Sequence, residues 1–424
     1  MNPAPRRPPA RPRPAAEAAA DSVPTAYLRP ADVDRVLAGH PWVYEGAVDR
    51  VTREPRDGDV VQVKDLRRRF LGVGFYNSRS KIRVRVLAQE RVELDDAFFK
   101  RRLEAALGHR RRFLPEATSC RLVNAEGDRL SGLIVDRYED VLVLQTSSVG
   151  MEQRKPMLVR LLQELVRPRA IVERNDMAAR RFEGLPPAEG LLAGSLGDDE
   201  LKALPVRLNG LQFRADLSAG HKTGLYLDQQ ENHALVARLA AGGRVLDCFS
   251  FMGGFGLAAA RAGAAEVTLV DQSADAVARA ERAAAEHGLS DRCRFATANV
   301  FDWLREQTAA PPHEQVVPRY DLAILDPPSF TRTRSAVPDA LRGYKEIHLR
   351  ALRLVRPGGL IATFCCSHHV PAPLFESAIV AAAHDARRQL RRVAVYAQAA
   401  DHPVLPAVPE TEYLKGFAYE VLPA

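Results

Sequence analysis

Cysteine is scarce in this chain of 424 residues, which contains five: Cys120, Cys248, Cys293, Cys365 and Cys366. An odd number argues against a complete disulfide framework, and none of the spacings pairs cysteines in the way that zinc ligands are paired. Neither a disulfide-stapled fold nor a metal site is expected. We predict reduced thiols that are either buried or catalytic.

Long apolar runs are also missing, because no segment approaches the length that crosses a bilayer and no apolar signal core follows the amino terminus. Residues 1–22 are a low-complexity run of Pro, Arg and Ala that cannot bury apolar surface, so we expect a disordered tail. An Arg-rich start could also be an organelle transit peptide, but the prolines argue against its amphipathic helix. We expect a cytoplasmic protein without membrane contact.

Positive charge is in excess: the net charge of +7 and the pI near 9.3 suit a polyanionic partner without identifying one.

The length predicts two or three domains. Residues 26–90 have the pattern of short strands and turns, and Arg83 and Arg85 form a basic face opposite apolar residues. Residues 91–117 predict a basic helical connector, which either tracks a phosphate backbone or presents an exposed face. Residues 118–217 predict a small α+β domain ending in a hairpin.

The stretch from Arg244 to Gln272 has the most informative pattern. An apolar run, Val245–Cys248, leads into a glycine turn, an Ala-rich helical segment and a second apolar run that ends on Asp271. In open α/β sheets the ligand lies at the carboxyl ends of the strands, where an acid after the second strand binds a ribose diol. Asp271 is the candidate for that role.

The glycines of this turn, Gly253, Gly254 and Gly256, have the spacing G-G-x-G, so the dinucleotide pattern G-x-G-x-x-G is absent. Asp247, at the end of the first strand, would repel a phosphate and attract a cation. S-adenosylmethionine fits, because it combines an adenosine with a sulfonium and an ammonium. An ordinary βαβ unit and a nucleotide-binding one are the alternatives.

Strand and helix patterns continue to alternate after this unit, which predicts a doubly wound, mostly parallel, Rossmann-like sheet over residues 218–424. Residues 219–233 hold a dense polar cluster that includes Lys222 and Asp228. Polar groups massed ahead of a cofactor domain are expected to form part of the wall around its ligand, although helix capping explains some of them.

Asp326-Pro327-Pro328 ends an apolar strand at the edge of the sheet where ligands bind. The prolines fix a rigid loop without amide donors and would hold Asp326 toward a substrate. In amino-group methyltransferases a motif of this kind grips an exocyclic amine. Here it could grip the edge of a cytosine ring, or it could be a plain turn.

Two thiols, Cys365 and Cys366, follow at a strand end. Carbon 5 of cytosine is a poor nucleophile, and addition of a thiolate to carbon 6 activates it, so a cysteine beside the cofactor's methyl group is what such chemistry requires. Buried strand cysteines are more often inert. His368 and His369 have no second ligand pair at a suitable spacing, so we predict no metal.

In combination, D-C-F-S-F-M-G-G-F-G, V-D-Q-S, D-P-P-S-F, R-G-Y-K-E-I-H, T-F-C-C-S and A-D-H-P-V resemble motifs of the bacterial large-subunit ribosomal RNA cytosine-carbon-5 methyltransferases. Residues 26–90 resemble a PUA domain, a small RNA-binding fold. The resemblance implies a cofactor cleft with the following residues: Asp247, Phe249, Gly253, Asp271 for the ribose, and Asn299 or Asp302 near the adenine.

The resemblance also implies that Cys366 is the nucleophile, since similar proteins commonly read Ser-Cys-Ser where this chain has Cys-Cys-Ser. We therefore expect methyl transfer from S-adenosylmethionine to a cytosine of large-subunit ribosomal RNA, with Asp326 holding the base. DNA and membranes are not expected partners, and the oligomeric state is open, a homodimer included. The rivals are amine-directed base methylation and a non-catalytic RNA-binding or ribosome assembly factor.

Overall fold

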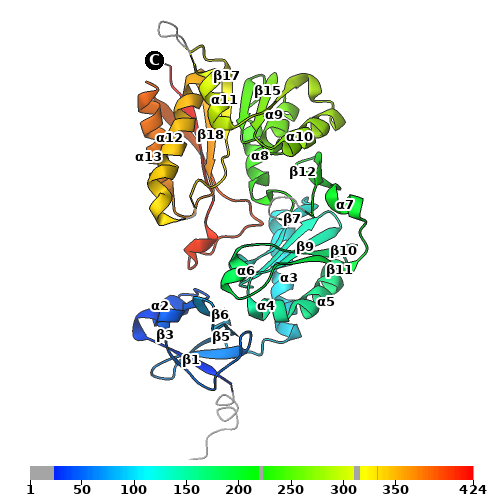
Figure 1. The fold of residues 1–424 in the computed structure, drawn as a ribbon, viewed down its shortest axis with the longest axis vertical. Helices are drawn as coiled ribbons and strands as arrows, with labels where there is room; N and C mark the ends of the chain where they lie inside the picture. The colour runs from blue at the N-terminus through cyan, green and yellow to red at the C-terminus, as the bar shows by residue number, and fades with distance from the viewer. Residues whose placement is uncertain (1–22, 219–222, 310–315, 332, 424) are drawn as a thin grey trace, which may run out of the picture.

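The structure is a computed structural model, and it describes residues 23–218, 223–309, 316–331 and 333–423. The predicted disordered tail lies outside the described residues, as does Lys222. Three large sheets and one hairpin follow one another along the molecule, from the amino-terminal sheet at the bottom of Figure 1 to the carboxy-terminal sheet at the top. None of the described helices is long and apolar enough to cross a membrane.

The amino-terminal sheet confirms the short strands predicted for this region. Its elements are β1 (Thr25–Leu28), α2 (Pro30–Leu37), β2 (Trp42–Tyr44), β3 (Val48–Val51), β4 (Val60–Asp65), β5 (Phe70–Tyr76) and β6 (Ile82–Ala88). The order of its six strands is β2-β6-β5-β4-β1-β3. The helix α2 was not predicted, although the proline at its first position is a helix-start signal.

The basic face predicted for β6 is not a solvated surface at Arg85, which is 9% exposed. Its guanidinium donates to Glu183 Oε1 at 2.9 Å and lies 3.5 Å from Glu126 Oε1. Trp42 Nε1 also donates to Glu126, at 2.9 Å. Both acids belong to the central region, so charge pairing between the two regions buries the arginine that the strand alternation alone had placed toward solvent.

The central sheet has five strands in the order β11-β10-β9-β8-β7. The elements of the region are α3 (Asp96–Phe113), β7 (Ser119–Asn124), β8 (Leu133–Tyr138), β9 (Val141–Thr146), α4 (Val149–Gln153), α5 (Lys155–Val166), β10 (Ala170–Asn175), α6 (Ala179–Phe182), β11 (Ala188–Gly194) and α7 (Asp198–Lys202). The predicted α+β pattern is confirmed.

The helix α3 is more than the connector that its basic composition suggested. Its apolar residues Phe99 and Leu103 are buried in the core of the central sheet. Arg110 is 3% exposed, and its guanidinium pairs with Asp128 and donates to the backbone carbonyl of Asp401 at 2.7 Å. This arginine is therefore not available to a phosphate backbone.

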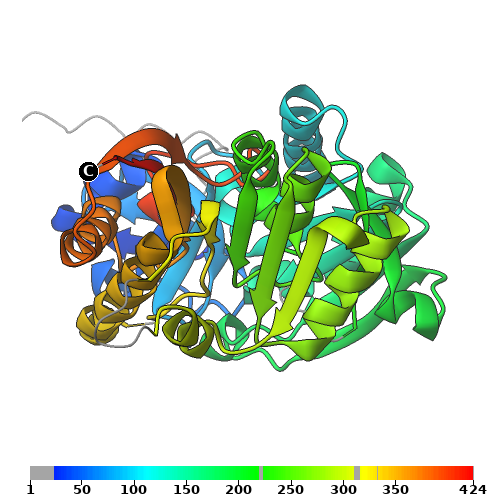
Figure 2. The same ribbon diagram turned by 90° about the horizontal axis from the view of Figure 1, so that it is seen from above.

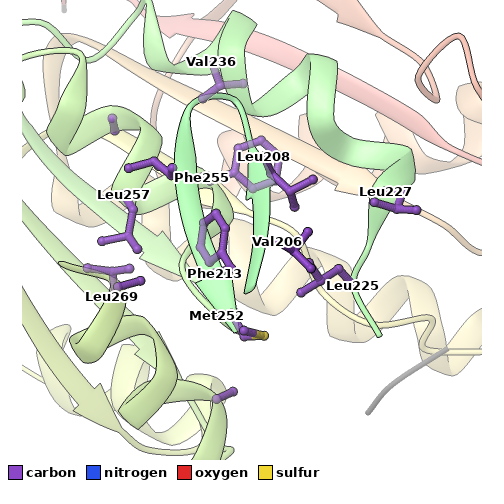
Figure 3. Packing of buried hydrophobic residues seen from close by; sticks show 14 of the residues in the cluster. Val206, Leu208, Phe213, Leu225, Leu227, Val236, Met252, Phe255, Leu257 and Leu269 are labelled. Atoms are coloured by element: carbon purple, nitrogen blue, oxygen red, sulfur yellow. The ribbon is translucent and has the colours of Figure 1, made fainter. Parts of the chain in front are cut away.

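The hairpin predicted around Asn209-Gly210 is present as β12 (Leu204–Leu208) and β13 (Leu211–Ala215), and both turn residues have positive φ. Its apolar face packs into the carboxy-terminal core, where Val206 and Phe213 lie among side chains of that domain (Figure 3). The sequence had assigned the hairpin to the central domain. Its buried side chains lie in a cluster that contains residues of both the central sheet and the carboxy-terminal domain.

The carboxy-terminal sheet has seven strands in the order β16-β15-β14-β17-β18-β20-β19. They are β14 (Arg244–Cys248), β15 (Glu266–Asp271), β16 (Cys293–Thr297), β17 (Tyr320–Leu325), β18 (Val355–Cys365), β19 (Leu390–Tyr396) and β20 (Lys415–Val421). The first five strands of this order are parallel and β20 is antiparallel to both of its neighbours. The predicted doubly wound, mostly parallel sheet is confirmed.

Helices cover both faces of this sheet, as Figure 2 shows from above. One core cluster joins the sheet to α8 (Gln230–Ala237), α9 (Gly254–Arg261) and α10 (Ala274–Glu286). The other joins it to α11 (Val300–Gln307), α12 (Val337–Leu354) and α13 (Ala372–Asp385). The parallel strands β14, β15, β17 and β18 therefore end together at one open edge, where a ligand can bind.

Arg85→Met tests the contact between the amino-terminal and central regions. The substitution leaves Glu183, 3% exposed, without its cation, so we expect the free energy of unfolding to fall by about 3 kcal/mol. Urea unfolding measures this change. Arg160→Met is the matched control, because both partners of its ion pair with Asp96 are 60% exposed and its loss should change little. Equal stability of the two variants would contradict the expectation.

Candidate active site

A cavity of about 550 Å³ lies at the carboxyl edge of the seven-stranded sheet. Residues that follow six strands of this domain, β14 to β19, contribute to it, together with the segment ahead of α8. Its wall consists of Tyr226, Asp228, Gln229, Phe249, Phe251, Asp271, Gln272, Ser273, Asn299, Val300, Phe301, Asp326, Pro327, Pro328, Ser329, Phe330, Cys366, Tyr413 and Leu414. The structure thus brings together most of the residues singled out from the sequence.

Asp271 ends β15 and points its carboxylate at the cavity. Its Oδ2 accepts a hydrogen bond from the Phe251 amide and its Oδ1 accepts one from the Ser273 amide, each at 2.8 Å. These two backbone donors fix the plane of the carboxylate. Each oxygen keeps a lone pair, so the group can accept two further hydrogen bonds from a diol.

Asp247 lies beneath the cavity rather than in its wall and is 1% exposed. Its Oδ2 accepts from the Gly256 amide at 2.8 Å, whereas its Oδ1 has no hydrogen-bond partner among the described residues. Burial, followed by the charges of Asp326 and Asp271, raises the pKa of Asp247 well above its ordinary value of 3.8. A ligand that brings a cation to this place would relieve the cost of ionising this group.

The glycine turn makes room for this arrangement. Gly253, although outside the cavity wall, has φ of +82°, a left-handed conformation that glycine adopts without strain. At Gly256 a Cβ atom would stand 2.6 Å from a Leu269 methyl and 2.9 Å from Asp247 Oδ2. Only a residue without a side chain lets α9 begin this close to the strand end.

The structure distinguishes between Asn299 and Asp302, the two alternatives expected near the adenine. Asn299 lines the cavity, and its Oδ1 caps α11 by accepting from the Phe301 amide at 3.0 Å. Asp302 is absent from the wall, and its side chain is 61% exposed and paired with Arg305. Phe249 and Phe301 contact each other edge to face at this end, which gives an apolar surface for a flat ring.

The polar segment ahead of α8 forms part of the cavity wall, as the density of its polar residues suggested. Gln229 Nε2 donates to Asp326 Oδ1 at 3.1 Å, while Gln229 Oε1 accepts from Asn232 Nδ2 at 2.6 Å. Because Asn232 occupies the oxygen, the amide must present its NH₂ group to Asp326. Tyr413 Oη donates to Asp228 Oδ2 at 2.6 Å on the same wall.

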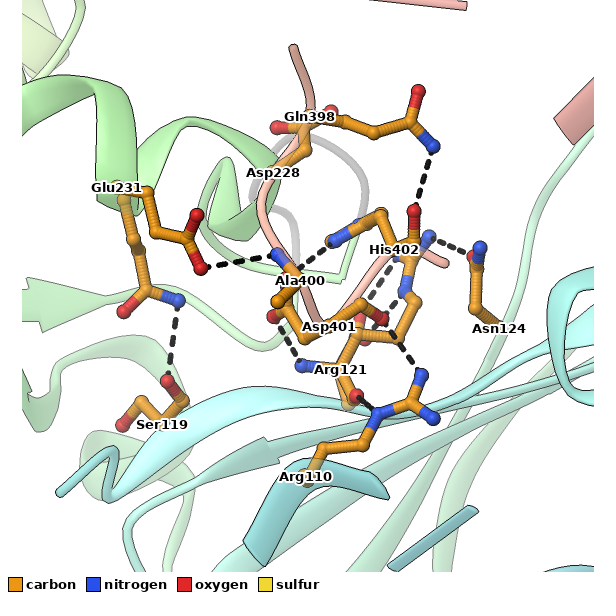
Figure 4. A network of polar contacts seen from close by, with 12 residues as sticks. Arg110, Ser119, Arg121, Asn124, Asp228, Glu231, Gln398, Ala400, Asp401 and His402 are labelled. Carbon is orange, nitrogen blue, oxygen red and sulfur yellow. Dashed lines mark hydrogen bonds and ion pairs between the residues drawn. The ribbon is translucent and has the colours of Figure 1, made fainter. Parts of the chain in front are cut away.

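The long loop between β19 and β20, residues 397–414, is bonded both to the central sheet and to α8 (Figure 4). Asp401 Oδ2 accepts from the Arg121 amide of the central sheet at 2.8 Å. The Ala400 amide donates to Glu231 of α8 at 3.1 Å. These bonds fix the loop whose last residues close the cavity.

Cys365 and Cys366 lie in different environments at the end of β18. Cys365 is fully buried in the core next to α12, and its Sγ donates to Tyr344 Oη at 3.3 Å. Cys366 lines the cavity. Ser367 turns back toward the core, with its Oγ 3.1 Å from Tyr344 Oη and 2.9 Å from Ser329 Oγ. The alternation of a strand thus continues through the two thiols.

Sequence reasoning missed several members of the wall. Tyr226, Phe251 and Tyr413 were not proposed, and Gln229 was placed in the polar segment without a partner. Phe251 lies inside the glycine turn, at the carboxyl end of a strand beside the one that ends on Asp271. Its place in the sequence could therefore have marked it as a neighbour of Asp271. Tyr413 lies far along the chain from the other residues, and no local pattern marks it.

Three comparisons bear on this site. Residues 26–89 match the model of a PUA-like domain, and residues 191–405 match that of an S-adenosylmethionine-dependent methyltransferase. A candidate S-adenosylmethionine-dependent methyltransferase from Streptococcus mutans superimposes with a TM-score of 0.77 at 20% identity, over 94% of this chain and 100% of its own. A similar structure, with a TM-score of 0.78 at 21% identity and the same coverage, contains SAH.

The fold and the cavity therefore define an S-adenosylmethionine-dependent methyltransferase. The ribosomal RNA large subunit methyltransferase I of Tolumonas auensis is 38% identical over 94% of this chain and 99% of its own length. That of Shewanella denitrificans is 39% identical over 93% and 98%. The chain belongs to the family of these methyltransferases. The acids around the cavity fit the cofactor, whose sulfonium and ammonium are both cationic.

Asp271→Ala tests the ribose contact. Loss of two charge-assisted hydrogen bonds should weaken S-adenosylmethionine binding by about 3 kcal/mol, more than 100-fold, in a calorimetric titration. Asp302→Ala is the matched control, because this acid follows the neighbouring strand but lies outside the cavity. Similar affinity of the two variants would locate the ribose elsewhere.

Asp247 should make cofactor binding depend on pH. Its raised pKa means that the carboxyl of the free protein holds a proton above pH 3.8, and a bound ammonium favours the ionised form. Binding should therefore release a proton, and affinity should rise with pH until the free protein itself is ionised. Calorimetry in buffers of different ionisation enthalpy measures the release. Asp247→Asn should abolish it, and proton uptake by the unsubstituted protein would contradict the assignment.

Proposed function

We propose that this protein methylates carbon 5 of a cytosine in large-subunit ribosomal RNA, in the cytoplasm, through a covalent adduct with Cys366. The observation that carries the proposal is that Cys366 lies in the cavity wall with Asp326, while the neighbouring thiol of Cys365 is buried in the core. The printed names of the relatives supply the class of RNA. The PUA-like domain would contact the RNA through surfaces other than Arg85.

The proposed cofactor site combines the carboxylates and the aromatic end of the cavity. Asp271 would hold the ribose, Asn299 and Phe249 would flank the adenine, and Asp228 and Asp247 would attract the cationic end of the cofactor. Bound S-adenosylmethionine supplies an electrophilic methyl group. The G-G-x-G turn supports this arrangement, because it brings the backbone close to the ligand without building a phosphate site.

The residues of the chain perform the other steps. The Cys366 thiolate would add to carbon 6 of the cytosine. The electron pair that moves to carbon 5 would form the new bond to the methyl carbon, while the bond between that carbon and the sulfonium sulfur breaks and leaves a neutral thioether. Carbon 5 then loses its proton to a base, and the resulting electron pair expels the sulfur from carbon 6. Thiolate and aromatic ring are both restored.

Asp326 is suited to hold the base during these steps. Its Oδ1 accepts from Gln229, and the two prolines that follow restrict the loop. A carboxylate in a fixed orientation can accept a hydrogen bond from the exocyclic amine of cytosine at low entropic cost. The same contact serves the amine-directed rival, so the thiol and not the acid distinguishes the two reactions.

The cysteine variants test this function. Cys366→Ala should abolish methyl transfer while keeping the fold and cofactor affinity, since only a thiolate forms the carbon 6 bond. Cys365→Ala should retain much activity, because its thiol bonds to Tyr344 in the core. RNA with 5-fluorocytosine at the target traps the adduct, because fluorine blocks the proton loss.

The outcomes separate the rivals. An adduct that persists in Cys366→Ala and disappears in Cys365→Ala reverses the assignment. Methylation without any adduct in the unsubstituted protein supports the amine-directed reaction. Binding of RNA without incorporation of methyl groups supports a non-catalytic factor.

A further inference from the structure

Lys415, the first residue of β20, occupies an unusual place behind the cavity wall. It follows Tyr413 and Leu414, which line the cavity, and it pairs with Cys365 across the β18–β20 ladder. Its Nζ donates to the backbone carbonyl of Ser367 at 2.7 Å. This hydrogen bond thus ties the ammonium to the residue directly after Cys366.

The ammonium is half-buried, and no described carboxylate lies within ion-pair distance of it. The pKa of Lys415 is lowered overall, because burial outweighs the opposing effects of Cys365, Cys366 and Glu412. Interaction between two groups is reciprocal, so an ammonium that a thiolate stabilises also stabilises the thiolate. Cys365 is buried and its Sγ contacts Tyr344 Oη in the core, so Cys366 is the thiol of this pair that faces the cavity.

Among the residues that the structure describes, the other groups around Cys366 do not supply this positive charge. Asp326 and Asp271 share the cavity with it, and their negative charges oppose a thiolate. Burial, then Lys415 and His369, lower the pKa of His368, which keeps this imidazole neutral.

The hydroxyl groups near the thiol are neutral as well. Burial raises the pKa of Tyr226 to about 12, and burial also raises the pKa values of Tyr344 and Tyr413. The carboxylate of Asp228 adds a further negative charge to the same wall. Formation of a thiolate among these groups needs a cation, and Lys415 is placed to provide it.

We propose that Lys415 is a positioning residue for Cys366: its ammonium fixes the Ser367 carbonyl, and with it the turn that carries the thiol, and stabilises the Cys366 thiolate once the proton has left to solvent. The inference rests on the proposed function, in which Cys366 is the nucleophile.

Alkylation by iodoacetamide tests the inference without RNA. Cys366 is the only one of the five cysteines that is not buried, so the rate of alkylation as a function of pH gives its apparent pKa, with Cys366→Ala as the blank. Lys415→Met should raise this pKa by about one unit, which slows alkylation about tenfold at pH 7. Lys415→Arg should restore most of the rate.

Two further variants separate charge from hydrogen bonding. Lys415→Gln can still donate to the Ser367 carbonyl but is neutral, so it should shift the pKa as Lys415→Met does while melting near the unsubstituted temperature. Lys345→Met is the matched control, because Lys345 of α12 is 40% exposed and paired with Asp385. It should leave the alkylation profile unchanged.

An apparent pKa that is the same in the unsubstituted protein, Lys415→Met and Lys415→Gln overturns the inference. Trapping with 5-fluorocytosine RNA keeps this failure apart from that of the proposed function. If the unsubstituted protein forms the adduct but the alkylation profiles of the variants do not shift, only the role of Lys415 is contradicted. If the profiles shift but no adduct forms, the contact between Lys415 and the Cys366 thiolate is supported and cytosine carbon 5 is contradicted as the target.

Discussion

Mutual repulsion of carboxylates at one cavity is the constraint on which the arrangement of this site depends. Asp228, Asp247, Asp271 and Asp326 converge at the carboxyl edge of the sheet. Each is met by a donor from the protein: a tyrosine hydroxyl, a glycine amide, two backbone amides and a glutamine side chain respectively. These donors hold the acids in place but add no positive charge, so the site is complementary to a cationic ligand.

The donors come from separate parts of the chain, and this explains why the cavity needs the whole carboxy-terminal half. The glutamine precedes the first strand of the sheet, two of the amides lie in the glycine turn, the Ser273 amide follows β15, and the tyrosine lies near the end of the loop before the last strand. The loop is in turn bonded to the central sheet through Asp401 and Arg121. The central region therefore supports the site without lining it.

Several arginines are paired with acids inside the protein, which changes the meaning of the basic composition. Arg85, Arg110 and Arg121 each pair with a carboxylate at an interface between elements. Such charges contribute to the formal excess of +7 but are not presented to a polyanion. Net charge was a correct reason to consider RNA and a poor guide to the surface that contacts it, because composition carries no information on which arginines are paired inside.

The sequence by itself determined the features that depend on neighbours along the chain: the alternation of strands and helices, the hairpin at Asn209-Gly210, the glycine turn and the acid after the second strand. It also required Cys365 and Cys366 to face opposite ways, since side chains alternate along a strand. Only the tertiary structure decided which thiol meets the cavity, because that depends on α12 packing against one side of β18, where Tyr344 receives Cys365. Partners that are distant in sequence, such as Tyr413 for Asp228, follow from packing that no local pattern encodes.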